Sequence, residues 1–132
     1  MASVVLDASV LIALYSSRDR NHKWAIDFFK QTLDRNLKMT VLNFAECLVH
    51  PVRAGKFEEF NSGIAGLGIE IVGLEPPAAA ELAKLRAETS LKMPDVLVLF
   101  QALKSNAALA STDLQLSNTA RKLGLETFSP AG

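Results

Sequence analysis

Short apolar runs alternate with longer stretches of helical periodicity from one end of this sequence to the other. The run Ser3–Leu6 is apolar and rich in β-branched residues, which is typical of a buried strand. Strands that alternate with helices predict a mainly parallel sheet with helices on both faces, an α/β fold. We expect strands at residues 3–6, 38–42, 68–74, 107–111 and 125–128.

The stretches between these runs carry apolar residues every three or four positions, as on the inner face of a helix. Trp24, Phe28 and Phe29 follow this spacing, and we expect them in the core or at a dimer contact. No repeat or linker interrupts the pattern, so residues 1–132 are expected to form a single domain. Helices are expected up to Tyr15, over residues 23–36, from Asn43 to about Pro51, and over residues 54–67, 76–89, 95–104 and 118–123.

The composition excludes several classes of protein. With 49% hydrophobic and 21% charged residues, the sequence is globular and not disordered. Lys and Arg total 14, as do Asp and Glu, so the formal net charge is zero. A neutral chain is a poor passive coat for nucleic acid, although an enzyme can still hold nucleic acid through a local patch and a metal. Near-zero net charge also favours self-association.

Cysteine usage and hydropathy point to a protein of the cytoplasm. Cys47 is the single cysteine, which excludes an internal disulfide and fits a reducing compartment. The apolar start of the chain is interrupted by Asp7 and has no basic residue before it, so it is a poor signal peptide. No apolar stretch reaches the roughly 18 residues needed to cross a bilayer. We therefore expect a cytoplasmic protein without a membrane segment.

Four acidic residues stand where an expected strand gives way to a helix, or where a helix begins. Asp7 follows the first strand, and Asp113 follows the strand at residues 107–111. Glu46 lies in the expected first turn of the helix after the second strand, and Asp95 begins another helix. The carboxyl ends of parallel strands share one edge of the sheet, where ligands bind. The four carboxylates are thus expected to converge on one crevice.

Clustered carboxylates repel one another unless protons or a cation neutralise them. Hard oxygen ligands suit Mg²⁺ or Mn²⁺, which can activate a water and bind phosphate. Each acid also has a simpler interpretation as a helix cap, and Asn43 to Glu46 resembles a capping box. Asp95, however, stands beside the apolar run Val96–Phe100, and a carboxylate in such surroundings usually has a function.

These acids lie in motifs that resemble those of PIN domains, and the resemblance covers nearly the whole chain in order. Each motif alone is weak, and their order within this length makes the resemblance more specific. The length is most similar to that of VapC-type toxins of toxin–antitoxin pairs. The motifs are Val5-Leu6-Asp7-Ala8-Ser9-Val10-Leu11-Ile12-Ala13, Asn43-Phe44-Ala45-Glu46, Lys92-Met93-Pro94-Asp95-Val96, and Ala110-Ser111-Thr112-Asp113 with Ala120-Arg121-Lys122-Leu123-Gly124-Leu125 after it.

The resemblance implies a PIN-like doubly wound sheet and an endoribonuclease that uses Mg²⁺ or Mn²⁺ to hydrolyse RNA. It also implies a homodimer and a small antitoxin protein that blocks the site. Asp7, Glu46, Asp95 and Asp113 would be the catalytic metal ligands.

Further residues would contact the substrate or support the site. Ser9, Ser111 and Thr112 match polar positions beside the first and fourth acids, and Arg86 matches an arginine that would contact phosphate. The sequence departs from the family pattern at Val96, where an alanine is usual, and at Ser111, where a threonine is usual. The first change adds bulk beside Asp95, and the second keeps a hydroxyl.

Two other phosphate chemistries fit the sequence less well. Asp7 as the nucleophile of a haloacid-dehalogenase-like phosphatase would need a second acid where Ser9 stands. A receiver domain would need an acid paired with Asp7 and a lysine at a strand end, but Lys104 and Lys122 lie elsewhere.

The rival class is a non-catalytic PIN-like module that binds RNA or a protein partner, although a binder has no need of a repulsive carboxylate cluster. His22 and His50 have no second ligand beside them, and Cys47 has no histidine partner nearby in sequence. We therefore expect surface or capping histidines and a small buried cysteine. Lys38, Arg53 and Lys56 are either solvated surface charges or a local patch for RNA phosphate.

Overall fold

The computed structural model describes residues 2–130 and contains one sheet of five parallel strands in this range. The strand order is β3-β2-β1-β4-β5, so β1 lies at the centre. Leu6 of β1 is paired with Ala110 of β4, and Val5 is paired with Lys38 of β2. The α/β fold with a parallel sheet is therefore as the sequence predicts. The strands are β1 (Ser3–Leu6), β2 (Asn36–Thr40), β3 (Glu70–Val72), β4 (Ala108–Ala110) and β5 (Thr127–Phe128).

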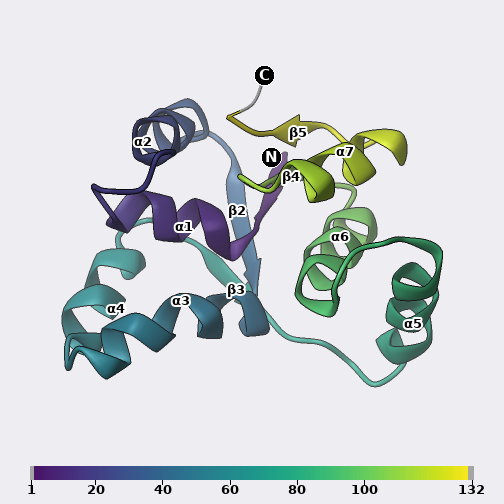
Figure 1. Ribbon diagram of the computed structural model, residues 1–132, viewed down its shortest axis with the longest axis horizontal. Coiled ribbons are helices and arrows are strands. Elements are labelled where there is room, and N and C mark those ends of the chain that lie inside the picture. Colours follow the sequence, from purple (N-terminus) through teal and green to yellow (C-terminus); the bar gives the residue numbers. More distant parts are fainter. Residues whose placement is uncertain (1, 131–132) are drawn as a thin grey trace.

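Helices cover both faces of this sheet, as Figure 1 shows with the sheet between two groups of ribbons. One group, α1 to α4, packs on one face, and the other, α5 to α7, packs on the opposite face. Within residues 2–130, none of the helices is both long and apolar enough to cross a membrane. The helices are α1 (Ala8–Tyr15), α2 (His22–Gln31), α3 (Val41–Arg53), α4 (Phe57–Ala65), α5 (Ala78–Glu88), α6 (Met93–Ser105) and α7 (Leu114–Lys122).

The alternation of side chains along β1 divides the core into two layers. Val4 and Leu6 pack with α1 and α2, whereas Val5 packs with α6 and α7. All three side chains are fully buried, and each contributes about 1.5–3 kcal/mol of transfer free energy. Phe28 and Phe29 of α2 are also buried in the first layer, which confirms their expected place in the core.

The order of the strands creates a switch point beside β1. From β1 the chain proceeds through α1 and α2 to β2 on one side, and β4 is added later on the other side. The two connections leave the carboxyl ends of β1 and β4 in opposite directions, which is the arrangement beside which doubly wound sheets bind ligands. Asp7 follows β1 directly, and Asp113 begins α7 after β4. The fold thus brings two of the four acids to the position where doubly wound sheets bind ligands.

The second helix is shorter than the sequence predicts. α2 ends at Gln31 and not near Asn36, which instead begins β2. The Thr32 hydroxyl donates to the Phe28 carbonyl, 2.9 Å away, at the end of the helix. Leu33 continues the helical spacing of Phe29 in the sequence, but its side chain is 86% exposed. The helical spacing of apolar residues therefore predicted too long a helix, because the exposed Leu33 continues the spacing of the buried residues of α2.

The start of α3 also differs from the expected one. Strand β2 ends at Thr40 and not at residue 42, and Thr40 caps α3 by accepting a hydrogen bond from Asn43 N. Asn43 is therefore a helical residue and not the cap, and Glu46 lies in the second turn of α3. The predicted capping box is wrong, because the hydroxyl of Thr40, three residues before Asn43, caps the N-terminus of the helix instead. Pro51 lies inside α3, which continues to Arg53.

The last helix begins earlier than expected, at Leu114 and not at residue 118. Asp113 is its N-cap, and its Oδ1 accepts a hydrogen bond from Leu116 N at 3.0 Å. The other elements match their expected positions with smaller changes at the ends, and β3, β4 and β5 are each shorter than the apolar runs that predict them.

Candidate active site

Asp7 occupies the cap position of α1 but does not cap the helix with its side chain. Its Oδ2 atom instead accepts hydrogen bonds from the hydroxyls of Ser9 and Ser111, both at 2.8 Å. The side chain is only 8% exposed. A buried carboxylate that is held by two hydroxyls and does not cap its own helix is placed for a ligand rather than for helix stability.

A small network of hydrogen bonds joins the ends of β1 and β4. Ser111 Oγ, which donates to Asp7, accepts from Asp113 N at 2.9 Å. Ser9 Oγ, the second donor to Asp7, accepts from Thr112 N at 3.1 Å. Each hydroxyl thus links the β1–α1 turn to the β4–α7 turn. The predicted support of Asp7 by Ser9 and Ser111 is present, and Thr112 takes part through its backbone.

Asn43 joins two further parts of the site, a role that the sequence did not indicate. Its side chain is fully buried, and Oδ1 accepts from Ala8 N at 3.3 Å. Nδ2 donates to Thr40 Oγ1 at 2.9 Å and to the Pro94 carbonyl at 3.3 Å. One amide therefore connects the residue after Asp7, the start of α3 and the first turn of α6. In the sequence, the only sign of this role is that Asn43 is a polar residue three positions before Glu46.

The other acids come to the same region from α3, α6 and α7. Asp95 lies half-buried in the first turn of α6, directly after Pro94, which Asn43 binds. Glu46 lies one turn after Asn43 on α3 and is exposed. Asp113 is exposed at the start of α7. The four acids are therefore carried by four segments that the two hydrogen-bond networks tie together.

The charges of these acids affect one another. Burial raises the pKa of Asp7, although the hydroxyls of Ser111 and Ser9 favour its charged form. Burial, and then the charge of Asp7, raise the pKa of Glu46. The pKa of Asp95 is raised to about 6 by burial and by the charges of Asp7, Asp113 and Glu46. Because Asp95 senses all three other carboxylates, the four acids form one electrostatic group that is stabilised by protons or by a cation.

The donor chemistry of this group fits a hard divalent cation, because every candidate ligand is a carboxylate oxygen. Across residues 2–130, however, no three His, Cys, Asp or Glu side chains stand in an arrangement that would already hold a metal ion. A shared metal site would require the exposed carboxylates of Glu46 and Asp113 to turn toward Asp7 and Asp95. Their exposure leaves room for this rotation.

Arg86 is not connected to the acids. It lies exposed in the last turn of α5, and no hydrogen bond or ion pair in the described part of the chain links it to the four carboxylates. Contact between Arg86 and a phosphate stays a prediction, as does direct contact of Ser9, Ser111 and Thr112 with a substrate.

Cys47 is a structural residue, as predicted. Its side chain is buried, and its Sγ lies 3.6 Å from the Ala8 carbonyl, to which the thiol donates. Burial, and then the charges of Asp7 and Glu46, raise the pKa of the thiol to about 12. A thiol that stays protonated at neutral pH is a poor nucleophile, so Cys47 packs beside the site without taking part in its chemistry.

Known structures share this fold at low sequence identity. A toxin–antitoxin complex from Klebsiella pneumoniae matches with a TM-score of 0.68 and 21% identity over 83% of this chain and 86% of that one. VapBC2 from Rickettsia felis, bound to a DNA fragment from its promoter, matches with a TM-score of 0.69 and 14% identity over 96% of this chain and 98% of that one. FitAcB from Neisseria gonorrhoeae matches with a TM-score of 0.66 and 14% identity over 97% of this chain and 98% of that one. At these identities the likeness concerns the fold alone.

The sequence itself identifies the family. No match was found among curated proteins. The family model of the PIN domain matches residues 4–122, a range that includes all four acids and both hydrogen-bond networks. Together with the parallel sheet in the order β3-β2-β1-β4-β5, this match shows that the chain belongs to the PIN domain family.

Proposed function

We propose that this protein is a metal-dependent endoribonuclease and the toxin of a toxin–antitoxin pair. The observation that carries the proposal is the linkage of four acid-bearing segments at the switch point of the sheet. Ser111 and Ser9 join the segments of Asp7 and Asp113, and Asn43 joins those of Asp7, Glu46 and Asp95. Membership of the PIN domain family supports a nuclease activity.

In this proposal Asp7, Glu46, Asp95 and Asp113 hold Mg²⁺ or Mn²⁺. The bound cation would lower the pKa of a water and neutralise charge on the phosphodiester. Asp7 is the fixed ligand, because two hydroxyls hold its Oδ2 and leave Oδ1 for another partner. Asp95 is the central ligand, since its pKa is raised by all three other acids and their repulsion favours cation binding there.

A proton acceptor is also needed, and in this proposal a carboxylate of the acid group takes that role rather than His22. His22 lies at the start of α2, and its Nδ1 is 2.8 Å from the Ala13 carbonyl. The buried wall of α6 behind Asp95 excludes bulk water from that side of the site.

An antitoxin partner is proposed from the neighbours, which are described as a toxin–antitoxin complex, VapBC2 and FitAcB. An antitoxin would act by covering the acids or by keeping RNA away from them. Homodimer assembly and a cytoplasmic location stay predictions from the sequence. Analytical ultracentrifugation of the purified chain checks the dimer.

The test is cleavage of labelled total RNA by the purified protein in Mg²⁺ or Mn²⁺, beside EDTA. We expect cutting that stops with EDTA and returns when Mn²⁺ is added in excess. Binding of RNA without any cutting, by folded and partner-free protein in either metal, would favour the non-catalytic module instead. Cutting that persists in EDTA would show that the activity does not depend on the proposed metal.

A further inference from the structure

A pocket of about 590 Å³ opens beside the acids, between α1, α3 and α4. Glu46, one of the four acids, is among its lining residues, so the pocket adjoins the candidate active site at this residue. In Figure 1 the three helices surround this region at the left of the sheet. A volume of this size is within the range of pockets that bind small ligands, about 300–1,000 Å³.

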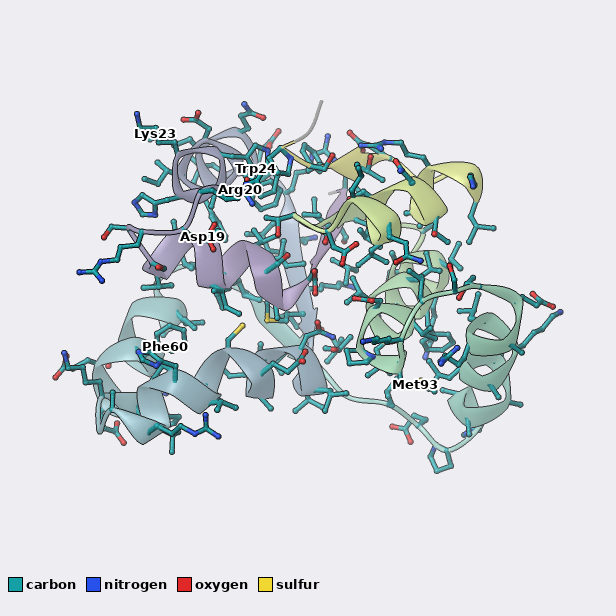
Figure 2. All side chains as sticks on the ribbon, viewed as in Figure 1. Asp19, Arg20, Lys23, Trp24, Phe60 and Met93 are labelled. Atoms are coloured by element: carbon teal, nitrogen blue, oxygen red, sulfur yellow. The ribbon has the colours of Figure 1, made fainter. Side chains whose placement is uncertain are left out.

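Aromatic and aliphatic side chains form the walls of the pocket. The rings of Tyr15 and Phe60 lie 4.8 Å apart between centroids and are tilted by 56°. Figure 2 labels Phe60 on α4, on the side of the helix that faces α1. Tyr15 is 43% exposed and Ile12 is 45% exposed, so both offer apolar surface to a ligand. Pro51 adds a further rigid apolar surface from α3.

Polar groups are placed around this apolar interior. His50 and Lys56 offer nitrogen donors, and Ser16 offers a hydroxyl. Glu59 adds an acceptor on the α4 side. Flat apolar walls with a few donors and acceptors are the chemistry that recognises a nucleobase, which has π-faces and a hydrogen-bonding edge.

We propose that this pocket binds one unpaired nucleobase of the RNA, from a nucleotide next to the phosphodiester that the acids cut. The inference rests on the proposed function, because it takes RNA as the substrate of the neighbouring acids. An RNA strand whose phosphate lies at Glu46 can place an adjoining nucleotide at the mouth of the pocket, because Glu46 lines it. A base that is already unpaired can enter without the cost of unstacking and unpairing that a duplex imposes. The pocket therefore selects single-stranded or looped RNA.

A nucleobase suits the pocket better than a protein segment does. The space is within the range of pockets for small ligands and is bordered by Glu46, one of the proposed metal ligands. Lys56, which the sequence placed in a candidate basic patch, lies at this pocket and supplies positive charge for the RNA backbone. Lys38 of β2 and Arg53 are not among the lining residues, so the patch is divided.

The first variant fills the pocket. Ala54 lines it, is exposed, and directly follows α3 with a negative φ of −85° and a ψ of −1°, so tryptophan meets no left-handed backbone there. Ala54→Trp should occupy the space of the base. Ala79→Trp adds the same side chain at an exposed position of α5 and is the matched control. Thermal unfolding of both variants checks that each is folded.

The second pair of variants tests stacking. Tyr15→Leu keeps an apolar contact with Phe60 but removes the aromatic face, whereas Tyr15→Phe keeps the ring. Loss of stacking on one base weakens binding by roughly 5- to 100-fold. Tyr15→Phe should therefore bind RNA more tightly than Tyr15→Leu. This comparison remains informative even if Ala54→Trp fails to fold.

The measurement is the anisotropy of fluorescein-labelled A10, C10 and U10 oligoribonucleotides in Ca²⁺, which carboxylates also bind. For the homopolymer that the wild type binds most tightly, we expect Ala54→Trp to raise Kd by roughly 5- to 100-fold and Ala79→Trp to leave it unchanged. The A10·U10 duplex should bind all variants alike. A U10 that carries 4-thiouridine should form photo-crosslinks with peptides that contain Tyr15 or Phe60.

Equal Kd values for the wild type, Ala54→Trp and Tyr15→Leu would overturn the inference, as would crosslinks confined to other surfaces. The readout does not depend on cutting. Crosslinks in the pocket without any cleavage would refute the proposed function alone, and wild-type cleavage by Ala54→Trp would refute the pocket alone.

Discussion

The Ser111 hydroxyl donates a 2.8 Å hydrogen bond to Asp7 Oδ2, although 104 residues separate the two in sequence. The bond is fully buried on the Ser111 side and crosses from the end of β4 to the end of β1. It orients the one deeply buried carboxylate of the acid group, and the same hydroxyl accepts from Asp113 N at 2.9 Å. Ser111, together with Ser9, therefore helps to fix the relative position of the first and fourth acids.

Removal of this hydroxyl should weaken the site more than the fold. In Ser111→Ala the buried carboxylate of Asp7 loses a hydrogen bond to a charged group, worth about 1.5–3 kcal/mol. We expect the Mn²⁺ concentration that gives half-maximal RNA cleavage to rise by roughly tenfold. Ser111→Thr, which keeps the hydroxyl, is the matched control. Identical Mn²⁺ dependence in Ser111→Ala and the wild type would show that the bond does not position Asp7.

Asn43 should be important for both stability and activity. Asn43→Ala leaves the buried Ala8 N and the Pro94 carbonyl without their partner and should lower the free energy of unfolding by about 2–4 kcal/mol. Urea unfolding followed by circular dichroism measures this loss. Asn61→Ala, at an exposed position of α4, should change it by less than about 0.5 kcal/mol. Equal stability of the two variants would contradict the linking role of Asn43.

The raised pKa of Asp95 predicts that the free energy of unfolding falls as the pH rises. The folded protein holds the Asp95 proton with a pKa of about 6, against 3.8 ordinarily, so this group stabilises the fold fully below pH 3.8 and loses that contribution as the pH rises through 6. The difference corresponds to about 3 kcal/mol, which solvent screening reduces to about 1 kcal/mol for a half-buried group.

Asp95→Asn mimics the protonated form and should therefore stabilise the metal-free protein at pH 7.5. We expect a gain in Tm of about 3–5 °C in EDTA, which disappears near pH 4. Thermal unfolding at both pH values measures it, with Asp27→Asn, an exposed acid of α2, as the control. A lower Tm for Asp95→Asn at pH 7.5 would mean that the acids do not repel one another as described.

Cys47 should resist alkylation in the folded protein. Its thiol is buried and its pKa is raised to about 12, so very little thiolate exists at pH 8. Iodoacetamide should react at least tenfold more slowly with the native chain than with the urea-unfolded chain, as followed by mass spectrometry. Equal rates would indicate an accessible thiol and a looser α1–α3 contact.

The sequence predicted the features that local pattern controls. The apolar runs predicted β1 and the other strands. The expected parallel sheet then placed one acid at the end of β1 and another after β4. Ser9 and Ser111 were expected to support the site, and their bonds to Asp7 are consistent with that expectation.

Features that depend on distant partners escaped prediction. Asn43 was interpreted as a helix cap because its local sequence resembles one, and only its contacts with Ala8 and Pro94 reveal its linking position. The pocket beside Glu46 was also missed, since Tyr15 and Phe60 meet across 45 positions of sequence and periodicity gives no sign of their contact. The end of α2 was misplaced because Leu33 is exposed.

The most direct test is the cleavage of one labelled RNA in Mn²⁺ by Asp7→Asn, Glu46→Gln, Asp95→Asn and Asp113→Asn, compared with Asp27→Asn and the wild type. If the four acids act as one metal site, each of the first four variants should lose at least about 100-fold in rate, while Asp27→Asn retains wild-type activity. Wild-type rates in both Asp7→Asn and Asp95→Asn would contradict the account, because the cutting would then not depend on the acids that the fold brings together.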